Sequence, residues 1–272
     1  MDFRKIHVVK RDGRVEEFDP KKVRKTILRA GLDSGTASRI IKRLEKMVYD
    51  GITTDEILQI VLDMLGKARG AGGKRYDLKG SLYRLGPDGF EFERFVARLL
   101  EEHGFMVETN RIVQGRCVEH EIDAVAEKGR KRYLVECKFH GIPVYTGLKE
   151  AVYTYARFLD TTIFDGVWLI TNTKFSEEAK RYAKCQGMRL TGWNYPEGEG
   201  IEYMLTSKAL YPVTLLDAEK TLIDRLVMSG YVFCRDVAAC GIDGLVGIGL
   251  KRGEAERIFS DAKSIISLNP SV

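Results

Sequence analysis

The 272-residue sequence has no apolar run that approaches the roughly 18 residues of a membrane-spanning helix. It also has no apolar core of a secretory leader near its start, which reads Met-Asp-Phe-Arg-Lys. These absences argue against a membrane span and a secreted product. We therefore expect a soluble, cytoplasmic protein.

Cysteine is scarce, and its spacing excludes two kinds of site. The five cysteines form no C-x-x-C pair, so the sequence suggests no zinc site, and their odd number suggests no disulfide framework. We expect these thiols to pack in a reducing compartment. They are Cys117, Cys137, Cys185, Cys234 and Cys240.

Neither sign of charge is in large excess. The net charge of +5 and the pI of about 8.8 permit nucleic-acid binding without demonstrating it. The hydrophobic content of 44% is ordinary for a globular protein, and the length allows two or three domains.

Two short apolar runs are the most informative part of the sequence. Residues 121–127 and 132–140 are separated by a basic turn at 128–131, which is typical of a β-hairpin. Because side chains alternate between the faces of a strand, Glu136 and Lys138 share one face. On the partner strand, the apolar residues alternate with three acids that face the other way, Glu121, Asp123 and Glu127. Three acids and a lysine can therefore converge, either as a metal-binding face or as a buried salt bridge.

Asp123 is followed at a fixed distance by the acid-x-lysine triplet at residues 136–138. The same distance separates Asp165 from a second acid-x-lysine triplet at residues 178–180. There the triplet follows Ser176 in a pattern typical of a capped helix, and residues two apart on a helix do not face one another. Only the copy at 123–138 combines the spacing with strands.

The chain divides into three segments at glycine-rich stretches, and we place the main boundary at Gly86-Pro-Asp-Gly89. Residues 1–85 are predicted to form a hairpin with a turn at Asp12-Gly13, then three helices. Residues 88–208 alternate helices with strands and predict an α/β layer. Residues 213–272 are predicted to be helical, with a glycine-rich turn at 244–249.

The middle segment resembles the Mrr-like restriction endonucleases of the PD-(D/E)xK nuclease superfamily. The resemblance rests on four motifs in order, which are residues 92–100, 121–123, 134–138 and 171–183. It implies a mixed central sheet flanked by helices and a DNA endonuclease that uses Mg²⁺ or Mn²⁺. By position it implies that Asp123 and Glu136 bind the metal, and that Lys138 assists the attacking water.

The same resemblance implies that Glu93 is an accessory acid on the helix, where an amphipathic surface position is the alternative. His120 and His140 flank the acids, and we expect both to be structural or surface residues. Lys149, Tyr153 and Arg157 follow on a helix, either as DNA-backbone contacts or as a solvated face.

The first segment resembles an ATP-cone, an α+β module that senses nucleotides. The matching residues are Val8-Val-Lys-Arg-Asp-Gly13, Glu16, Phe18-Asp19, Lys22-Val23 and Tyr49-Asp-Gly-Ile-Thr-Thr54. The resemblance implies that ATP or dATP binds, with the triphosphate near Lys10, Arg11 and Lys22. It places the nucleoside near Glu16, Asp19 and Thr54, although Leu58 stands where some members have a histidine. Lys10 and Arg11 are otherwise the charged end of a strand.

The last segment looks like a small all-helical domain with a helix-hairpin-helix unit at 245–249, where turn amides can bind a DNA phosphate. A plain helical packing module is the alternative. Together the segments predict a DNA endonuclease, with a homodimer as one expectation for double-strand cleavage. The rival interpretations are a nucleotide-responsive DNA-binding regulator that does not cut and a scaffold without metal or DNA.

Overall fold

A computed structural model describes residues 6–10, 13–65, 71–86 and 89–267. Arg11, Asp12 and the Pro87-Asp88 pair of the expected boundary lie outside these residues. The chain forms two compact units. The first comprises residues 1–78, 211–219 and 233–272, and the second comprises 79–210 and 220–232. The segment expected as a C-terminal helical domain is thus distributed over both units.

The first unit begins with a three-stranded sheet in the order β2-β1-β3, in which β1 is antiparallel to β2 and parallel to β3. Asp19 caps α1 by accepting a hydrogen bond from the backbone N–H of Lys21, and Pro20 is the first helical residue, as the sequence predicts. The elements are β1 (His7–Val9), β2 (Val15–Glu17), α1 (Pro20–Arg29), α2 (Ser34–Leu44), β3 (Ile52–Thr53), α3 (Thr54–Met64) and α4 (Ala71–Tyr76).

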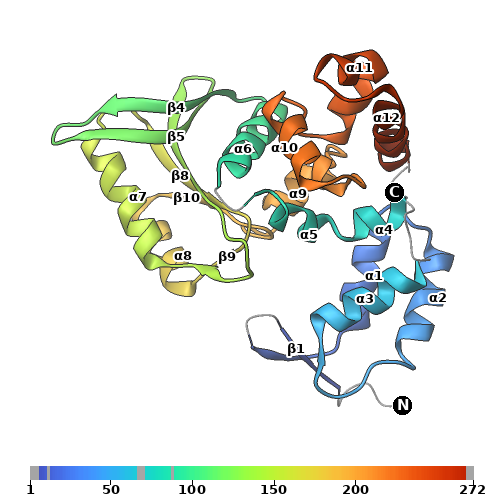
Figure 1. Cartoon of the computed structure of the whole chain (residues 1–272). Coiled ribbons are helices and arrows are strands. Elements are labelled where there is room, and N and C mark those ends of the chain that lie inside the picture. Colours follow the sequence, from blue (N-terminus) through green and yellow to red (C-terminus); the bar gives the residue numbers. More distant parts are fainter. Residues whose placement is uncertain (1–5, 11–12, 66–70, 87–88, 268–272) are drawn as a thin grey trace. The chain divides into compact units, whose positions relative to one another are not determined.

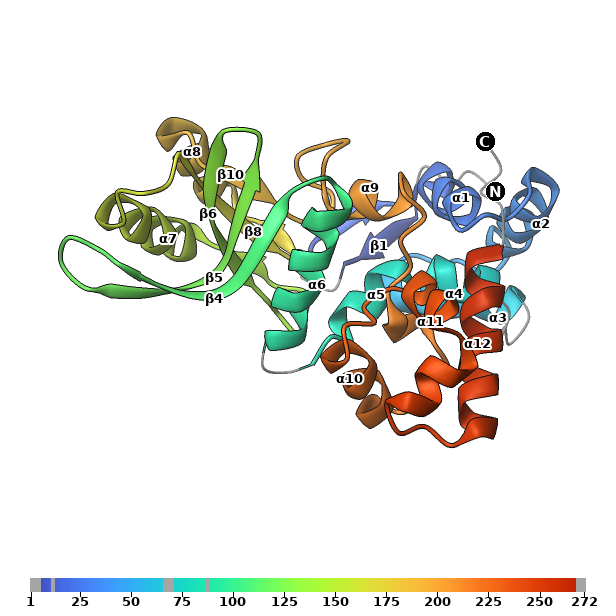
Figure 2. The ribbon, with the colours of Figure 1, turned by 90° about the horizontal axis from the view of Figure 1, so that it is seen from above.

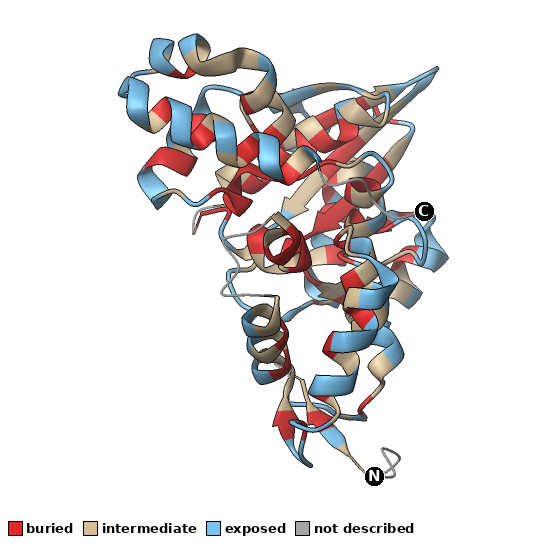
Figure 3. Ribbon diagram, turned by 90° about the vertical axis from the view of Figure 1, so that its right-hand side faces the viewer, coloured by how far each residue is buried: buried red, intermediate tan, exposed pale blue. Residues whose placement is uncertain are grey.

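Each helix of this unit buries its apolar stripe. Ile27 of α1, Leu44 of α2 and Val61 of α3 are fully buried and pack around Ile52 of β3. Figure 3 shows buried residues along one side of the helices and exposed residues on the other. The amphipathic spacing in the sequence therefore identifies the core of this unit correctly.

Helices from the end of the chain complete the first unit, with η2 (Val213–Leu215), α11 (Cys234–Gly247) and α12 (Arg252–Ser267). A kink at Gly241, where φ is 70°, divides α11. The predicted turn at 244–249 is wrong in its extent, because the chain stays helical to Gly247 and turns only over 248–251. The backbone groups of residues 244–247 can still be satisfied within the helix, so Gly244 does not end it.

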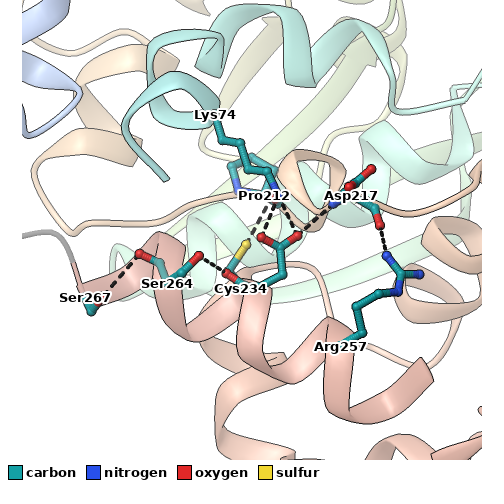
Figure 4. A network of polar contacts seen from close by, with 8 residues as sticks. Lys74, Pro212, Asp217, Cys234, Arg257, Ser264 and Ser267 are labelled. Atoms are coloured by element: carbon teal, nitrogen blue, oxygen red, sulfur yellow. Dashed lines mark hydrogen bonds and ion pairs between the residues drawn. The ribbon is translucent and has the colours of Figure 1, made fainter. Parts of the chain in front are cut away.

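A buried ion pair joins these late helices to α4. Lys74 Nζ lies 2.5 and 2.6 Å from the two carboxylate oxygens of Asp261 on α12, and both side chains are almost buried. Asp261 also accepts a hydrogen bond from the backbone N–H of Asp217, while Arg257 donates to the Asp217 carbonyl (Figure 4). The network ties three separate segments of the chain into one unit.

The second unit is built on a five-stranded mixed sheet in the order β10-β8-β6-β5-β4. The β4–β5 and β5–β6 pairs are antiparallel, whereas the β6–β8 and β8–β10 pairs are parallel. Figures 1 and 2 show α6 on one face of this sheet and α7 and α8 on the other. The sheet is thus covered on both faces, which explains why its central strands are apolar on both sides.

The main elements of this unit follow the order that the sequence predicts, and the α/β fold class is confirmed. The helix α10 packs against α6. None of the helices within the described ranges is long and apolar enough to cross a membrane. The elements are α5 (Leu78–Tyr83), α6 (Phe90–Glu102), β4 (Met106–Gln114), β5 (Glu119–Lys128), β6 (Lys131–Lys138), β7 (Tyr145–Thr146), α7 (Leu148–Asp160), β8 (Gly166–Thr171), β9 (Lys174–Phe175), α8 (Glu177–Gln186), β10 (Arg189–Thr191), α9 (Ile201–Thr206) and α10 (Lys220–Met228).

The predicted hairpin at the centre of the sheet is confirmed. β5 and β6 pair antiparallel up to Lys128 and Lys131, which leaves a two-residue turn. Gly129 occupies the left-handed region with φ of 64°, a conformation that suits glycine in such turns. The alternate triplet at 178–180 lies on α8, which Ser176 caps, so it does not form a second strand pair.

Candidate active site

Asp123 and Glu136 lie side by side on the central hairpin. Ala124 of β5 pairs with Val135 of β6, and the two acids are the next residues along each strand. The backbone N–H of Cys137 donates a 2.7 Å hydrogen bond to Oδ2 of Asp123. The Asp123 side chain therefore reaches across to β6, and the two carboxylates share one region of the sheet.

Glu93 comes to the same region from a different element. It lies in the first turn of α6, which is fixed to the sheet by the fully buried Phe92, Phe95 and Val96. Burial, followed by the negative charges of Asp123 and Glu121, raises the pKa of Glu93 to about 7. The pKa of a fully exposed acid would not be raised by burial in this way. Glu93 therefore lies on the side of α6 that is near the hairpin acids.

The hairpin acids are themselves perturbed. Burial, followed by the negative charge of Asp123, raises the pKa of Glu136 to about 7. Burial also raises the pKa of Asp123, although the Cys137 hydrogen bond opposes this rise. Carboxylates with raised pKa values at one place are typical of functional sites, because such sites bring buried like charges together.

The sequence identifies Arg157 as a DNA-backbone contact or a residue of a solvated face, but it does not reveal the contact with Glu136. It lies on α7, is only 8% exposed, and its Nη1 donates to Oε2 of Glu136. It belongs neither to a solvated face nor to an exposed DNA-contacting surface. Its Nε is buried and has no hydrogen-bond partner in the described structure. Arg157 thus supplies positive charge from within the protein to the acid on β6.

Lys138 ends β6 and has an exposed side chain. Its backbone carbonyl accepts a 2.7 Å hydrogen bond from the Thr171 hydroxyl. The next turn is fixed as well, because Asn172 accepts from the His140 N–H at 2.9 Å and donates to the His140 carbonyl at 2.8 Å. These bonds hold the backbone at Lys138 while its ammonium remains accessible to a ligand.

Both flanking histidines make structural contacts. His140 Nε2 lies 3.0 Å from the Thr146 hydroxyl, and burial, followed by the charge of Lys138, lowers the pKa of His140. His120 Nε2 lies 2.8 Å from the carboxylate of Asp160. Asp160 also accepts from backbone N–H groups of the loop before β5, so His120 helps to hold that loop.

The donors at this site suit a hard divalent cation. The acids offer only oxygen ligands, which Mg²⁺ prefers. Within the described ranges, however, no group of three or more His, Cys, Asp or Glu side chains is arranged to hold a metal ion. A site that provides one or two carboxylates and leaves the other positions to water and phosphate is the usual arrangement for Mg²⁺. Asp123 and Glu136 fit that arrangement.

The first unit brings together part of the predicted nucleotide site. The ammonium groups of Lys10 and Lys22 lie 3.3 and 3.4 Å from the same carboxylate oxygen of Glu16. Asp19 is engaged as the cap of α1. Thr54 begins α3, but the capping threonine is Thr53, whose side chain and backbone bond to Glu56.

The turn before α12 does not present the phosphate-binding amides that its sequence suggests. The backbone N–H groups of Ile248, Gly249 and Leu250 all donate to carbonyl groups of the preceding helix, at 3.3, 2.9 and 3.2 Å. These amides are therefore used within the turn. The structure supports the alternative of a helical packing element at this position.

Two family models match the chain. Residues 6–71 match the ATP cone domain, and residues 86–194 match a restriction endonuclease domain of the Mrr type. The second range contains Glu93, the hairpin and Arg157. The two matches agree with the order of domains predicted from the motifs.

A curated relative from Archaeoglobus fulgidus, described as an uncharacterized protein, is 60% identical over 173 residues, which are 63% of this chain and 99% of the relative. A solved crystal structure is similar with a TM-score of 0.62 and 58% identity, and it covers 66% of this chain and 98% of its own. It is described as a protein of unknown function, AF1548.

Proposed function

The chain belongs to the Mrr-like restriction endonuclease family and carries an ATP-cone domain ahead of the endonuclease domain, and we propose that it is a metal-dependent DNA endonuclease. The observation that carries this proposal is the placement of Asp123 and Glu136 side by side on the hairpin, with Lys138 on the same strand as Glu136. Burial, followed by the negative charge of Asp123, raises the pKa of Glu93 and Glu136 to about 7, and burial raises the pKa of Asp123. Such a cluster is costly without a cation and suited to binding one.

In this proposal Asp123 and Glu136 hold Mg²⁺ or Mn²⁺, and Glu93 adds negative charge from α6. A metal ion held there would stabilise negative charge on the phosphate and lower the pKa of an attacking water. The exposed ammonium of Lys138 lies on the same strand as Glu136 and acts as a point charge toward the phosphate or the water. Hydrolysis of a phosphodiester bond needs both functions.

Arg157 positions Glu136 in the same reaction. Its hydrogen bond engages one carboxylate oxygen of Glu136 and leaves the other oxygen for a metal ion. The cation also favours the ionised form of Glu136 and Asp123 against the effect of burial. Arg157 thereby opposes protonation of the two ligands.

The same contact favours a second candidate function. An acid already paired with an arginine, in a site without a third ready ligand, also suits a DNA-binding regulator whose nuclease fold does not cut. This candidate predicts DNA binding that requires no divalent metal.

We propose that the ATP-cone domain binds ATP or dATP and regulates the nuclease. Lys10 and Lys22 converge on Glu16, which places two ammonium groups near one another. Phosphate oxygens would exchange these surface ion pairs for stronger, charge-assisted contacts. Arg11 remains part of the proposed phosphate site, and Thr54 and Asp19 part of the proposed nucleoside site.

A cleavage assay tests the proposal. Supercoiled plasmid and linear DNA are incubated with the full-length protein in Mg²⁺, Mn²⁺ or chelator, each with and without ATP or dATP. Asp123→Asn and Glu136→Gln should each lower the cleavage rate at least about 100-fold, because each removes a ligand of the metal ion. Chelator should abolish cleavage.

Glu178→Gln is the matched control, because Glu178 belongs to the decoy triplet on the exposed side of α8. It should leave the rate unchanged. Cleavage that persists in chelator or in Asp123→Asn contradicts the nuclease assignment. DNA binding in chelator without cleavage in any metal supports the regulator.

A further inference from the structure

The second unit contains a pocket that the proposed reaction does not use. It has a volume of about 360 Å³ and is lined by side chains from α6 through α9. The lining combines four aromatic residues with two cations and one acid, Glu199, and Tyr203 is the exposed aromatic residue. The other aromatic residues and the cations are Phe105, Lys128, Tyr133, Trp168 and Arg189.

The aromatic rings form a fixed cluster. The ring centroids of Phe105 and Trp168 are 5.5 Å apart, and Tyr133 lies 6.4 and 6.1 Å from them in edge-to-face arrangements. The indole N–H of Trp168 donates to the Thr191 hydroxyl at 3.0 Å. Gly166 leaves room for the Tyr133 ring, because a Cβ atom there would meet that ring at 3.0 Å. The pocket wall is therefore preformed.

The cations lie on the faces of these rings. The guanidinium of Arg189 stacks 3.9 Å from the Trp168 centroid, and the Lys128 ammonium lies 4.9 Å from that of Phe105. Lys128 also donates to the His103 carbonyl at 2.7 Å. Because positive charge already covers the aromatic faces, a cationic ligand such as a methylated ammonium is repelled. The two cations outnumber the single acid of the lining, Glu199, so a flat ligand with a negative charge is favoured.

This pocket is separate from the acid cluster. His103, at the end of α6, lines the pocket, whereas Glu93 lies in the first turn of that helix. Ten residues of helix correspond to about 15 Å. Tyr133 also lies on the opposite face of β6 from Glu136, since the two are separated by an odd number of positions. A ligand in the pocket therefore cannot be the group that the acids act on.

We propose that this pocket binds a nucleotide, with its base stacked on the Arg189 guanidinium and on Tyr203 and its phosphate near Lys128. Aromatic rings and guanidinium planes are the surfaces on which unpaired bases stack. The stack of Arg189 on Trp168 holds the guanidinium plane in place. The source of the nucleotide is either a free mononucleotide or an unpaired base of a DNA strand.

Tryptophan fluorescence gives a direct test, because the chain has only two tryptophans and both lie outside the ATP-cone match. Trp193→Phe leaves Trp168 as the sole reporter. This variant is titrated in chelator with dAMP, with a DNA hairpin that carries one unpaired adenine, and with the fully paired hairpin. Working in chelator makes the result independent of cleavage, so a failure of the nuclease proposal does not affect it.

Quenching by dAMP supports a free nucleotide, and quenching by the unpaired hairpin but not the paired one supports a DNA base. Arg189→Ala and Tyr203→Ala should each weaken that binding about 5- to 100-fold. Both side chains are exposed, so neither change removes a core residue. Arg181→Ala, at an exposed position of α8, is the matched control and should not change the binding. Absence of quenching by all probes, or binding that neither pocket variant weakens, overturns the proposal.

If Trp193→Phe does not fold, equilibrium dialysis of radiolabelled dAMP against Lys10→Ala/Lys22→Ala protein replaces the fluorescence measurement. That background removes the two ammonium groups proposed to bind nucleotide in the first unit. Binding that survives in this background and falls with Arg189→Ala supports the pocket. The hairpin with the unpaired adenine is dialysed in the same way, and binding of neither dAMP nor this hairpin overturns the proposal.

Discussion

Replacing Glu93 by glutamine should stabilise the metal-free protein at high pH. Burial and the neighbouring acids raise the pKa of Glu93 to about 7 in the folded protein, from an ordinary value of 4.5. Between these two values the unfolded chain releases the Glu93 proton while the folded protein retains it. The free energy of unfolding therefore falls as the pH rises across this window. Glutamine does not ionise, so the Glu93→Gln variant does not lose this part of its free energy of unfolding as the pH rises.

The size of the effect follows from the pKa values. One pKa unit corresponds to about 1.4 kcal/mol, so ionising Glu93 in the folded protein costs about 3 kcal/mol. Relative to the wild type, Glu93→Gln should gain about 1 kcal/mol at pH 5 and about 3 kcal/mol at pH 8. A stabilising change of that size at a single acid is unusual, because most substitutions destabilise.

Urea unfolding in chelator at pH 5, 6, 7 and 8 measures this gain. Glu101→Gln on the same helix is the control, because Glu101 forms a surface pair with Arg98. Its effect should stay below about 1 kcal/mol at every pH. Addition of Mg²⁺ should reduce the advantage of Glu93→Gln, since the cation neutralises the acids. A variant that is no more stable than the wild type at pH 8 would refute the reasoning that Glu93 is ionised there at a cost.

Three further predictions concern other parts of the chain. Arg157→Met should lower the free energy of unfolding at pH 8 by about 3 kcal/mol, because a buried acid loses its cation. The same change should weaken the binding of Mn²⁺ measured by calorimetry. Equal Mn²⁺ affinity in the variant and the wild type would contradict the positioning role. Asp261→Asn should destabilise the first unit by about 3 kcal/mol in urea, because Lys74 is left buried without a carboxylate, and a loss below about 0.5 kcal/mol would show that the pair is dispensable. Lys10→Ala/Lys22→Ala should weaken ATP binding at least about tenfold in calorimetry through loss of charge-assisted contacts, and unchanged heats of binding would remove both lysines from the phosphate site.

Local rules explain why much of the site could be predicted from the sequence. The alternation of side chains on a strand depends only on neighbouring residues, so the shared region of Asp123 and Glu136 follows once the hairpin is identified. Gly129 marks the turn of that hairpin. Ser176 likewise marks the start of a helix and excludes the decoy triplet. In each case the determining interactions lie within a few residues.

Contacts between distant elements could not be predicted in the same way. Arg157 is 21 positions from Glu136, and its place on an amphipathic helix fits a solvated face equally well. The late helices join the first unit through Asp261, which lies 187 positions from Lys74. No spacing within either helix indicates such a partner. These partners are determined by the packing of each whole unit.

The position of Arg157 sharpens the choice between a nuclease and a regulator. A buried arginine that leaves Nε without a partner is costly, and removing Glu136 would leave it without a compensating charge. A fold that only had to bind DNA could replace both residues with apolar side chains at no loss of stability. The buried pair of Arg157 and Glu136, together with the raised pKa of Glu93, thus favours the nuclease over the regulator. Arg157 then opposes protonation of Glu136 and leaves one carboxylate oxygen available to a metal ion.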